Sequence, residues 1–162
     1  MFCVQCEHTI RTPQGDAGCS FSRGMCGKTS EVSDLQDMLV HLLQAVATYA
    51  VAARKVGVVD AEIDAYVPQA FFSTLTNVNF DAERIIDFSR RAETYRNDLR
   101  ARYEAACAAQ GVTPEKLPAS AHYRLPDAKT VMLSDALSFA LNRGKKEVGE
   151  DVIGLRLLCL YG

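Results

Sequence analysis

The stretch SDLQDMLVHLLQAVATYAVAARKVG, residues 33–57, holds the clearest periodic pattern in this chain of 162 residues. Its apolar residues recur every three or four positions, which is the spacing of one face of an α-helix. They are Leu35, Met38, Leu39, Leu42, Val46, Tyr49, Ala53 and Val56. We expect Ser33 to cap the start of this helix and Gly57 to follow its end. The pattern predicts an amphipathic helix that packs one face against a core.

Two further stretches with helical spacing follow, one from Asp60 and one after Asp81. We expect Pro68 to split the first stretch into two helices, because proline removes a hydrogen bond and clashes inside a helix. The second stretch predicts one long arm of a helical bundle. Its apolar residues are Ile85, Phe88, Ala92, Tyr95, Leu99 and Tyr103.

The remaining third of the chain predicts a loop followed by two more helices. Residues 111–127 hold three of the five prolines and predict the loop. Helical spacing resumes over residues 133–141 and again from Val148 to the last residue. Because no segment alternates strictly between apolar and polar residues, the predicted fold class is all-α. We expect an irregular, cysteine-rich cluster-binding loop over residues 1–30 and a helical bundle, a single domain, over residues 31–162.

The composition excludes several classes of function. Apolar residues make up 48% of the chain, charged residues 23%, and the formal net charge is -2. Such a balance disfavours binding to nucleic acid or to a membrane surface. No apolar run approaches the roughly 18 residues that predict a membrane span. The first cysteine stands at position 3, which leaves no room for a secretory signal, so we expect a cytoplasmic protein.

Four of the six cysteines are crowded into the first 26 residues. Cys3 and Cys6 lie in MFCVQCEHT, whereas Cys19 and Cys26 lie in GCSFSRGMCGKT. Two, twelve and six residues separate successive members of this set. Cysteines in a reducing compartment bind metal or do chemistry more often than they form disulfides. The crowding therefore predicts a metal site held by these four thiolates.

Three roles for the four cysteines fit this spacing to different degrees: disulfides, a zinc site and an iron–sulfur cluster. Disulfides are disfavoured, because a large helical core does not need them. A structural zinc site usually has two to four residues between paired cysteines, which suits Cys3 and Cys6 but not Cys19 and Cys26. Iron–sulfur clusters tolerate less regular spacing, since their ligands reach different irons. The spacing favours an iron–sulfur cluster and leaves zinc open.

The surroundings of the cysteines favour a redox centre further, because glycine N–H groups and cations stabilise anionic sulfur. The candidates for this support are Gly18, Gly24, Gly27, Arg11, Arg23 and Lys28. His8 could offer a nitrogen ligand, but the four cysteines already complete a set. We expect the other two cysteines, Cys107 and Cys159, to be buried and inert. His41 and His122 receive no role.

Four segments of the chain carry a family resemblance: MFCVQCEHTIRTPQG, GCSFSRGMCGKTSEVSDLQDML, PQAFFSTLTNVNFD and GEDVIGLRLLCLYG. They resemble the amino-terminal portion of the hybrid-cluster protein, or prismane, family of hydroxylamine reductases. The resemblance implies that Cys3, Cys6, Cys19 and Cys26 hold an iron–sulfur cluster. It favours [2Fe–2S], the type associated with gaps of two, eleven and six residues, with [4Fe–4S] possible. This chain has one extra residue in the middle gap, near Asp16 and Ala17.

The resemblance also implies that electron transfer and catalysis take place in different domains. The family's catalytic hybrid iron–sulfur–oxygen cluster is held in later domains, so no catalytic residue is expected here and this chain alone should be inactive. Its cluster would pass electrons from an NADH-dependent or other reductase to those domains, where hydroxylamine becomes ammonia and water. Nitric oxide reduction and protein S-nitrosylation, activities linked to nitrosative stress, are alternatives. A zinc-stabilised helical interaction module is the alternative of another class.

The final apolar run, LRLLCLYG, suggests that the natural chain continues beyond Gly162. It reaches the last residue without a polar tail or a proline. We therefore expect exposed apolar surface on the last helix, chiefly around Leu157 and Leu160.

Overall fold

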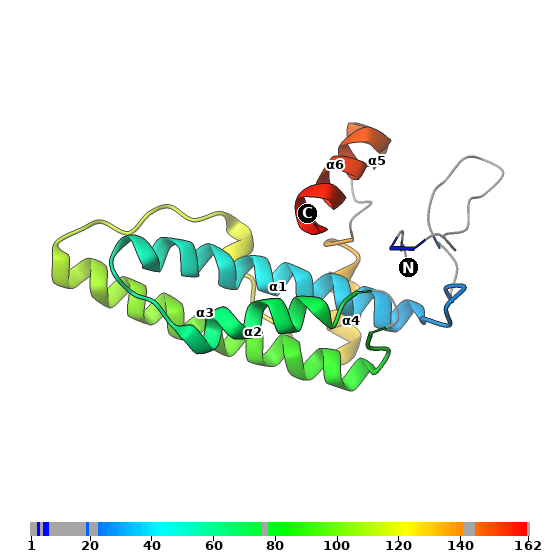
Figure 1. The fold of residues 1–162 in the computed structure, drawn as a ribbon, viewed down its shortest axis with the longest axis horizontal. Coiled ribbons are helices and arrows are strands. Elements are labelled where there is room, and N and C mark those ends of the chain that lie inside the picture. The colour runs from blue at the N-terminus through cyan, green and yellow to red at the C-terminus, as the bar shows by residue number, and fades with distance from the viewer. Residues whose placement is uncertain are drawn as a thin grey trace.

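The computed structural model describes residues 3, 5–6, 19, 23–75, 78–140 and 145–161. These residues form helices and connecting turns, with isolated β-bridges but no strand among them, which confirms the all-α prediction (Figure 1). In chain order the helices are α1 (Ser30–Lys55), α2 (Ala61–Phe72), α3 (Ala82–Gln110), the 3-10 helix η1 (Ala119–His122), α4 (Lys129–Ala136), α5 (Lys145–Val148) and α6 (Glu150–Tyr161).

Helix α1 begins earlier than its sequence predicts. Thr29 has an extended backbone, and its Oγ1 accepts the Val32 N–H at 3.3 Å, so Thr29 is the N-cap. The prediction that Ser33 caps the helix is wrong, because Ser33 lies inside the first turn and is buried. At the other end Gly57 has a φ of 81°, as expected of the residue that follows a helix.

Pro68 does not split the second helical stretch, so that prediction is also wrong. Helix α2 runs through Pro68 from its cap at Asp60 to Phe72. Pro68 and Asp64 are both exposed, so water can solvate the Asp64 carbonyl that loses its usual N–H donor. Tyr66 and Ala70 are buried on either side of the proline and hold both halves of the helix against the core.

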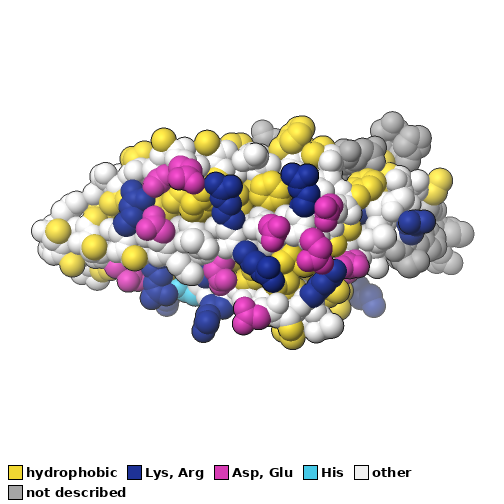
Figure 2. Space-filling model, turned by 90° about the horizontal axis from the view of Figure 1, so that it is seen from below, with side chains coloured by type: hydrophobic (Ala, Val, Ile, Leu, Met, Phe, Trp, Pro, Cys, Tyr) yellow, Lys and Arg dark blue, Asp and Glu magenta, His cyan; other side chains and the backbone are white. Residues whose placement is uncertain are grey.

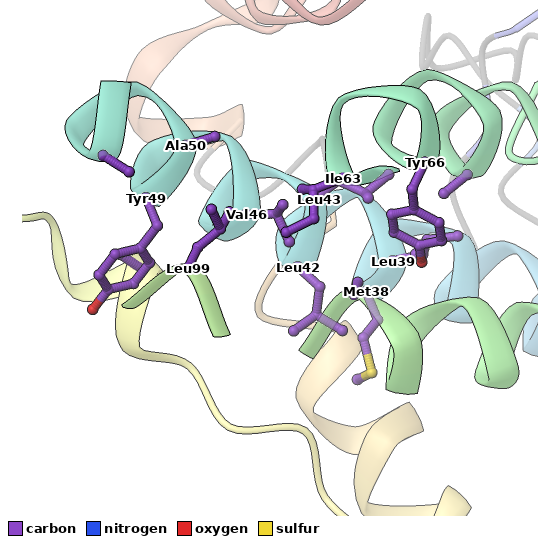
Figure 3. Packing of buried hydrophobic residues seen from close by; sticks show 14 of the residues in the cluster. Met38, Leu39, Leu42, Leu43, Val46, Tyr49, Ala50, Ile63, Tyr66 and Leu99 are labelled. Atoms are coloured by element: carbon purple, nitrogen blue, oxygen red, sulfur yellow. The ribbon is translucent and has the colours of Figure 1, made fainter. Parts of the chain in front are cut away.

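Helix α1 is the centre of the core, because it contacts α2, α3, η1 and α4. The close-up in Figure 3 shows its apolar side chains meeting residues of the neighbouring helices, among them Ile63, Tyr66 and Leu99. Each buried Leu or Val side chain contributes roughly 1.5–3 kcal/mol relative to exposure. The α1 residues that are fully buried include Leu35, Met38, Leu39, Leu42, Ala45, Val46 and Ala53.

Ion pairs tie the helices together at the surface. Arg91 of α3 reaches Glu62 of α2 at 3.2 Å, and Lys129 of α4 reaches Glu83 of α3 at 3.0 Å. Acidic and basic side chains are interspersed over the face shown in Figure 2. Among the helices that the structure describes, none is both long and apolar enough to cross a membrane.

The carboxyl-terminal helices α5 and α6 stand apart from α1, α2 and α3 (Figure 1). Gly149, at a φ of 82°, separates α5 from α6, so the apolar run from Val148 onward is interrupted. Cys107 is buried in α3 as predicted, but Cys159 is exposed and the prediction of a buried thiol is wrong there. Since α6 packs chiefly on α5, it has little core to cover this thiol. The side chains of Leu157 and Leu160 lie outside the described set, whereas nearby Leu155 is exposed.

Candidate metal centre

Cys3 and Cys19 lie side by side through a pair of backbone hydrogen bonds. The Cys3 N–H donates to the Cys19 oxygen at 3.2 Å, and the Cys19 N–H donates to the Cys3 oxygen at 2.7 Å. This antiparallel bridge brings together two cysteines that lie far apart in the sequence. Cys19 is buried and Cys3 is half-buried, as is Cys6. The fold therefore brings Cys3, from the first pair of cysteines in the sequence, next to Cys19, from the second pair.

Cys26 sits at the tip of a short hairpin directly before α1. The Gly24 N–H donates to the Lys28 oxygen at 2.7 Å, and the Gly27 N–H donates to the Gly24 oxygen at 2.9 Å. A three-residue loop with a glycine at positive φ is a common hairpin connection, and Gly27 has a φ of 90°. The exposed Cys26 thus stands on a turn that leads directly into α1, the helix with the most buried residues.

The same hydrogen bonds overturn one expectation about the glycines. Gly24 and Gly27 were predicted to offer their N–H groups to anionic sulfur. Both N–H groups instead donate to backbone oxygens within the hairpin, so these residues shape the turn. Gly18, Arg11 and His8 lie outside the described residues.

The electrostatic environment of Cys3 links three of the four cysteines. Burial is the largest influence and raises the pKa of the Cys3 thiol, while the Gln5 backbone N–H and the Lys28 charge lower it. Cys19 and Cys26 are near enough to raise the same pKa through their own charge. Among the described residues, no three His, Cys, Asp or Glu side chains are arranged as a ready-made metal site. The four-cysteine ligand set therefore stays a prediction.

A buried lysine lies beside these cysteines and joins several segments. Lys28 is 2% exposed, and its Nζ donates to Gln36 Oε1 at 2.7 Å and reaches Gln5 Oε1 at 3.5 Å. The amide of Gln36 donates to the Asn79 oxygen at 3.0 Å, and that of Gln5 donates to the Thr74 oxygen at 3.1 Å. This network connects the cysteine-bearing segment, the hairpin, α1 and the turn between α2 and α3.

Sequence reasoning named Lys28 as a nearby charge but missed both glutamines. Gln36 is 4% exposed and lies four residues from each of the apolar residues Val32 and Val40, and a polar residue at this helical spacing was the available signal. Gln5 offered no such signal, since only the fold brings it to Lys28. Arg23, the other predicted cation within the described residues, is exposed and forms a backbone bridge with Thr29.

Two histidines that received no role have aromatic partners. The ring of His41 stacks on Phe139 with 3.8 Å between centroids and 6° between planes. His122 Nδ1 lies 3.1 Å from the hydroxyl of Tyr49. The first contact joins the turn after α4 to α1, and the second joins η1 to α1. His41 is half-buried and His122 is exposed, and both belong to the helical bundle.

Comparison with known protein families covers the whole sequence, because residues 1–162 match the Prismane/CO dehydrogenase family. The chain belongs to that family. Membership confirms the resemblance to the amino-terminal portion of a prismane protein and implies an oxidoreductase-type protein that binds iron–sulfur.

The residues of this Prismane/CO dehydrogenase family chain fit an iron–sulfur group chemically. Such clusters are held by cysteine thiolates, and here Cys19 and Cys26 lie near enough to Cys3 to raise its pKa, while Cys6 is half-buried and lies close to Cys3 in the sequence. A cluster with four thiolates carries net negative charge, and the buried ammonium of Lys28 offers the opposite charge. Cys3, Cys6, Cys19 and Cys26 are the side chains that would hold it.

Proposed function

We propose that Cys3, Cys6, Cys19 and Cys26 bind an iron–sulfur cluster that relays electrons to a catalytic centre outside residues 1–162. The observation that carries this proposal is the backbone pairing of Cys3 with Cys19, beside which Cys26 and a buried lysine lie. Family membership supports the cluster itself. The cysteine spacing favours [2Fe–2S], with [4Fe–4S] as the alternative.

When bound, the group supplies one-electron transfer. The chain's own residues provide the frame. The Cys3–Cys19 bridge holds two thiols at neighbouring positions, and the hairpin positions Cys26 at the amino end of α1. Because α1 is packed on several sides, this end of the helix is a rigid support. Burial of Cys19 and partial burial of Cys3 and Cys6 limit access of water and oxygen to these sulfur atoms.

In the complete protein the electrons would serve the reduction of hydroxylamine. The balanced reaction takes hydroxylamine, two electrons and two protons to ammonia and water. An NADH-dependent or other reductase in the cytoplasm would donate the electrons, and the remaining catalytic domains of the same polypeptide would receive them. Reduction of nitric oxide and S-nitrosylation of proteins are the alternative outputs of the same electron relay.

Anaerobic purification or reconstitution of the chain, followed by iron and sulfide analysis, tests the cluster. We expect two irons and two sulfides per chain for [2Fe–2S], or four of each for [4Fe–4S]. Replacing Cys3, Cys19 or Cys26 by serine should abolish or strongly reduce the iron content. Cys159→Ala is the matched control, since Cys159 is an exposed thiol on α6 and should leave it unchanged. A colourless chain that holds one zinc regardless of iron and sulfide supply would refute the proposal.

The relay role needs a separate measurement. The isolated chain should not turn over hydroxylamine, because we assign no catalytic residue within it. In the complete polypeptide, Cys26→Ser should slow hydroxylamine reduction by a protein electron donor, while Cys159→Ala should not. Steady turnover by residues 1–162 alone would contradict this assignment.

A further inference from the structure

Lys28 is a buried cation whose contacts are neutral. It is 2% exposed, and the amide oxygens of Gln36 and Gln5 are its hydrogen-bond acceptors. Its ammonium also lies 5.9 Å from the centre of the Phe80 ring. In the part of the chain that the structure describes, no carboxylate forms an ion pair with it. Burying a charge without an opposite charge is costly, so this position calls for a negative group nearby.

The elements that hold Lys28 are the elements that hold the cysteines. Lys28 stands two residues after Cys26, and its backbone oxygen closes the hairpin that carries this cysteine. Its partner Gln5 lies between Cys3 and Cys6 in the chain. The ammonium is thus tied on one side to the hairpin and on the other to the first cysteine pair.

A purely structural role would explain the hydrogen bonds but not the charge. A neutral side chain of similar length could fill the space under Phe80, and it would not need two glutamines to compensate for burial. The charge has a use if the neighbouring thiolates carry a cluster. Four thiolates on the common iron–sulfur cores leave a formal charge of about -2, which becomes about -3 on reduction.

We propose that Lys28 is a charge-compensating residue whose buried ammonium raises the reduction potential of the cluster bound by the four cysteines. The inference rests on the proposed function. One electron from the donor adds one negative charge, and no bond to Lys28 forms or breaks. The ammonium attracts the reduced form more strongly than the oxidised form, and the low local dielectric strengthens that difference.

Potentiometric titration of the reconstituted full chain with dithionite as reductant tests this role. The reduced fraction is followed by electron paramagnetic resonance. In Lys28→Met the equilibrium constant for reduction should fall by about tenfold or more, which for one electron is a negative shift of about 59 mV or more. Lys28→Arg keeps the positive charge and should stay closer to the wild-type potential.

Lys55→Met is the matched control for loss of a lysine charge. Lys55 ends α1, pairs with Glu115 at the surface, and lies roughly 37 Å along the helix from Ser30 at 1.5 Å per residue. Salt screens exposed charges beyond about 10 Å, so this variant should keep the wild-type potential.

Gln36→Glu provides a second test that does not depend on the fold tolerating methionine at position 28. It places a carboxylate where an amide oxygen now accepts from Lys28 at 2.7 Å, and so neutralises the ammonium with little change in shape. We expect a negative shift of the same order as in Lys28→Met. Unchanged potentials in either loaded variant would overturn the role of Lys28. A wild-type chain without iron would instead overturn the proposed function, and this inference with it.

Discussion

Replacing Arg96 with methionine should detach the loop before α4 from helix α3. Arg96 is 3% exposed, and its Nη1 donates to the backbone oxygens of Ala121 at 3.0 Å and Tyr123 at 2.5 Å. Its Nη2 donates to Glu93 Oε1 at 3.2 Å, and the same carboxylate accepts the Leu125 N–H at 2.9 Å. One guanidinium therefore secures to α3 the loop whose 3-10 helix η1 packs against α1.

The cost of this substitution follows from the two carbonyls. Methionine retains much of the aliphatic volume of Arg96 but has no donor, so both backbone oxygens lose a charged partner. A hydrogen bond to a charged group contributes about 1.5–3 kcal/mol, and the two together about 3–6 kcal/mol. The Glu93 side chain is partly exposed, so water can replace its partner and we add no further cost. We expect a loss of about 4 kcal/mol, a large share of the roughly 5–15 kcal/mol typical of a domain.

Urea unfolding of the metal-free chain, followed by the circular dichroism of its helices, measures this loss. With a slope of about 2 kcal/mol per molar urea, the midpoint should fall by about 2 M. Arg100→Met is the matched control, because Arg100 is an exposed arginine one turn later that pairs with Glu104 at 2.8 Å. Its effect should stay within about 0.5 kcal/mol. A loss below about 1 kcal/mol for Arg96→Met would refute the reasoning.

Three further predictions about the helical frame can be tested in the same assay. Leu42→Ala, at a fully buried position, should cost about 2–5 kcal/mol, whereas Val51→Ala at an exposed position should stay within about 0.5 kcal/mol; equal effects would contradict the assigned core. Pro68→Ala should stabilise the chain, by at most about 3 kcal/mol, because it restores an N–H donor and removes a clash; destabilisation would show that the proline is needed for packing. The hydrogen bond from Arg102 lowers the pKa of Asp60 in the folded chain. The charged carboxylate therefore stabilises the fold at pH values above the ordinary carboxyl pKa. This stabilisation is lost as the pH falls through the lowered pKa. Asp60→Asn should therefore weaken the decline of the urea midpoint between about pH 5 and about pH 3, as should Arg102→Gln, and a decline unchanged in both variants would exclude this pair as a cause.

Much of the fold was predictable because helices depend on local spacing. The apolar periodicity from Leu35 to Val56 and from Ile85 to Tyr103 identified α1 and α3. The starts predicted near Asp60 and Asp81 are also right, and the structure shows these two residues as N-caps. Boundaries were less predictable, because several residues near a start can act as a cap. Thr29 is the N-cap because the hairpin before it leaves its backbone extended. The sequence around Ser33 does not reveal that hairpin, so it could not decide between the two caps.

The candidate site divides in the same way. The crowding of Cys3, Cys6, Cys19 and Cys26 was visible in the sequence, but their partners were not. The pairing of Cys3 with Cys19 depends on a backbone bridge between distant residues. The sequence also could not show that the Gly24 N–H donates to the Lys28 backbone oxygen rather than to a cysteine sulfur.

By itself, the sequence determined which residues form helices and which residue types are available to bind metal. Both properties depend on neighbours a few positions apart or on side-chain chemistry alone. Only the tertiary structure decided that Lys28 is buried against Gln5 and Gln36, that Pro68 stays within one helix, and that Cys159 is exposed. Burial, solvation and charge proximity are set by contacts between segments distant in the chain, and those contacts exist only once the helices have packed.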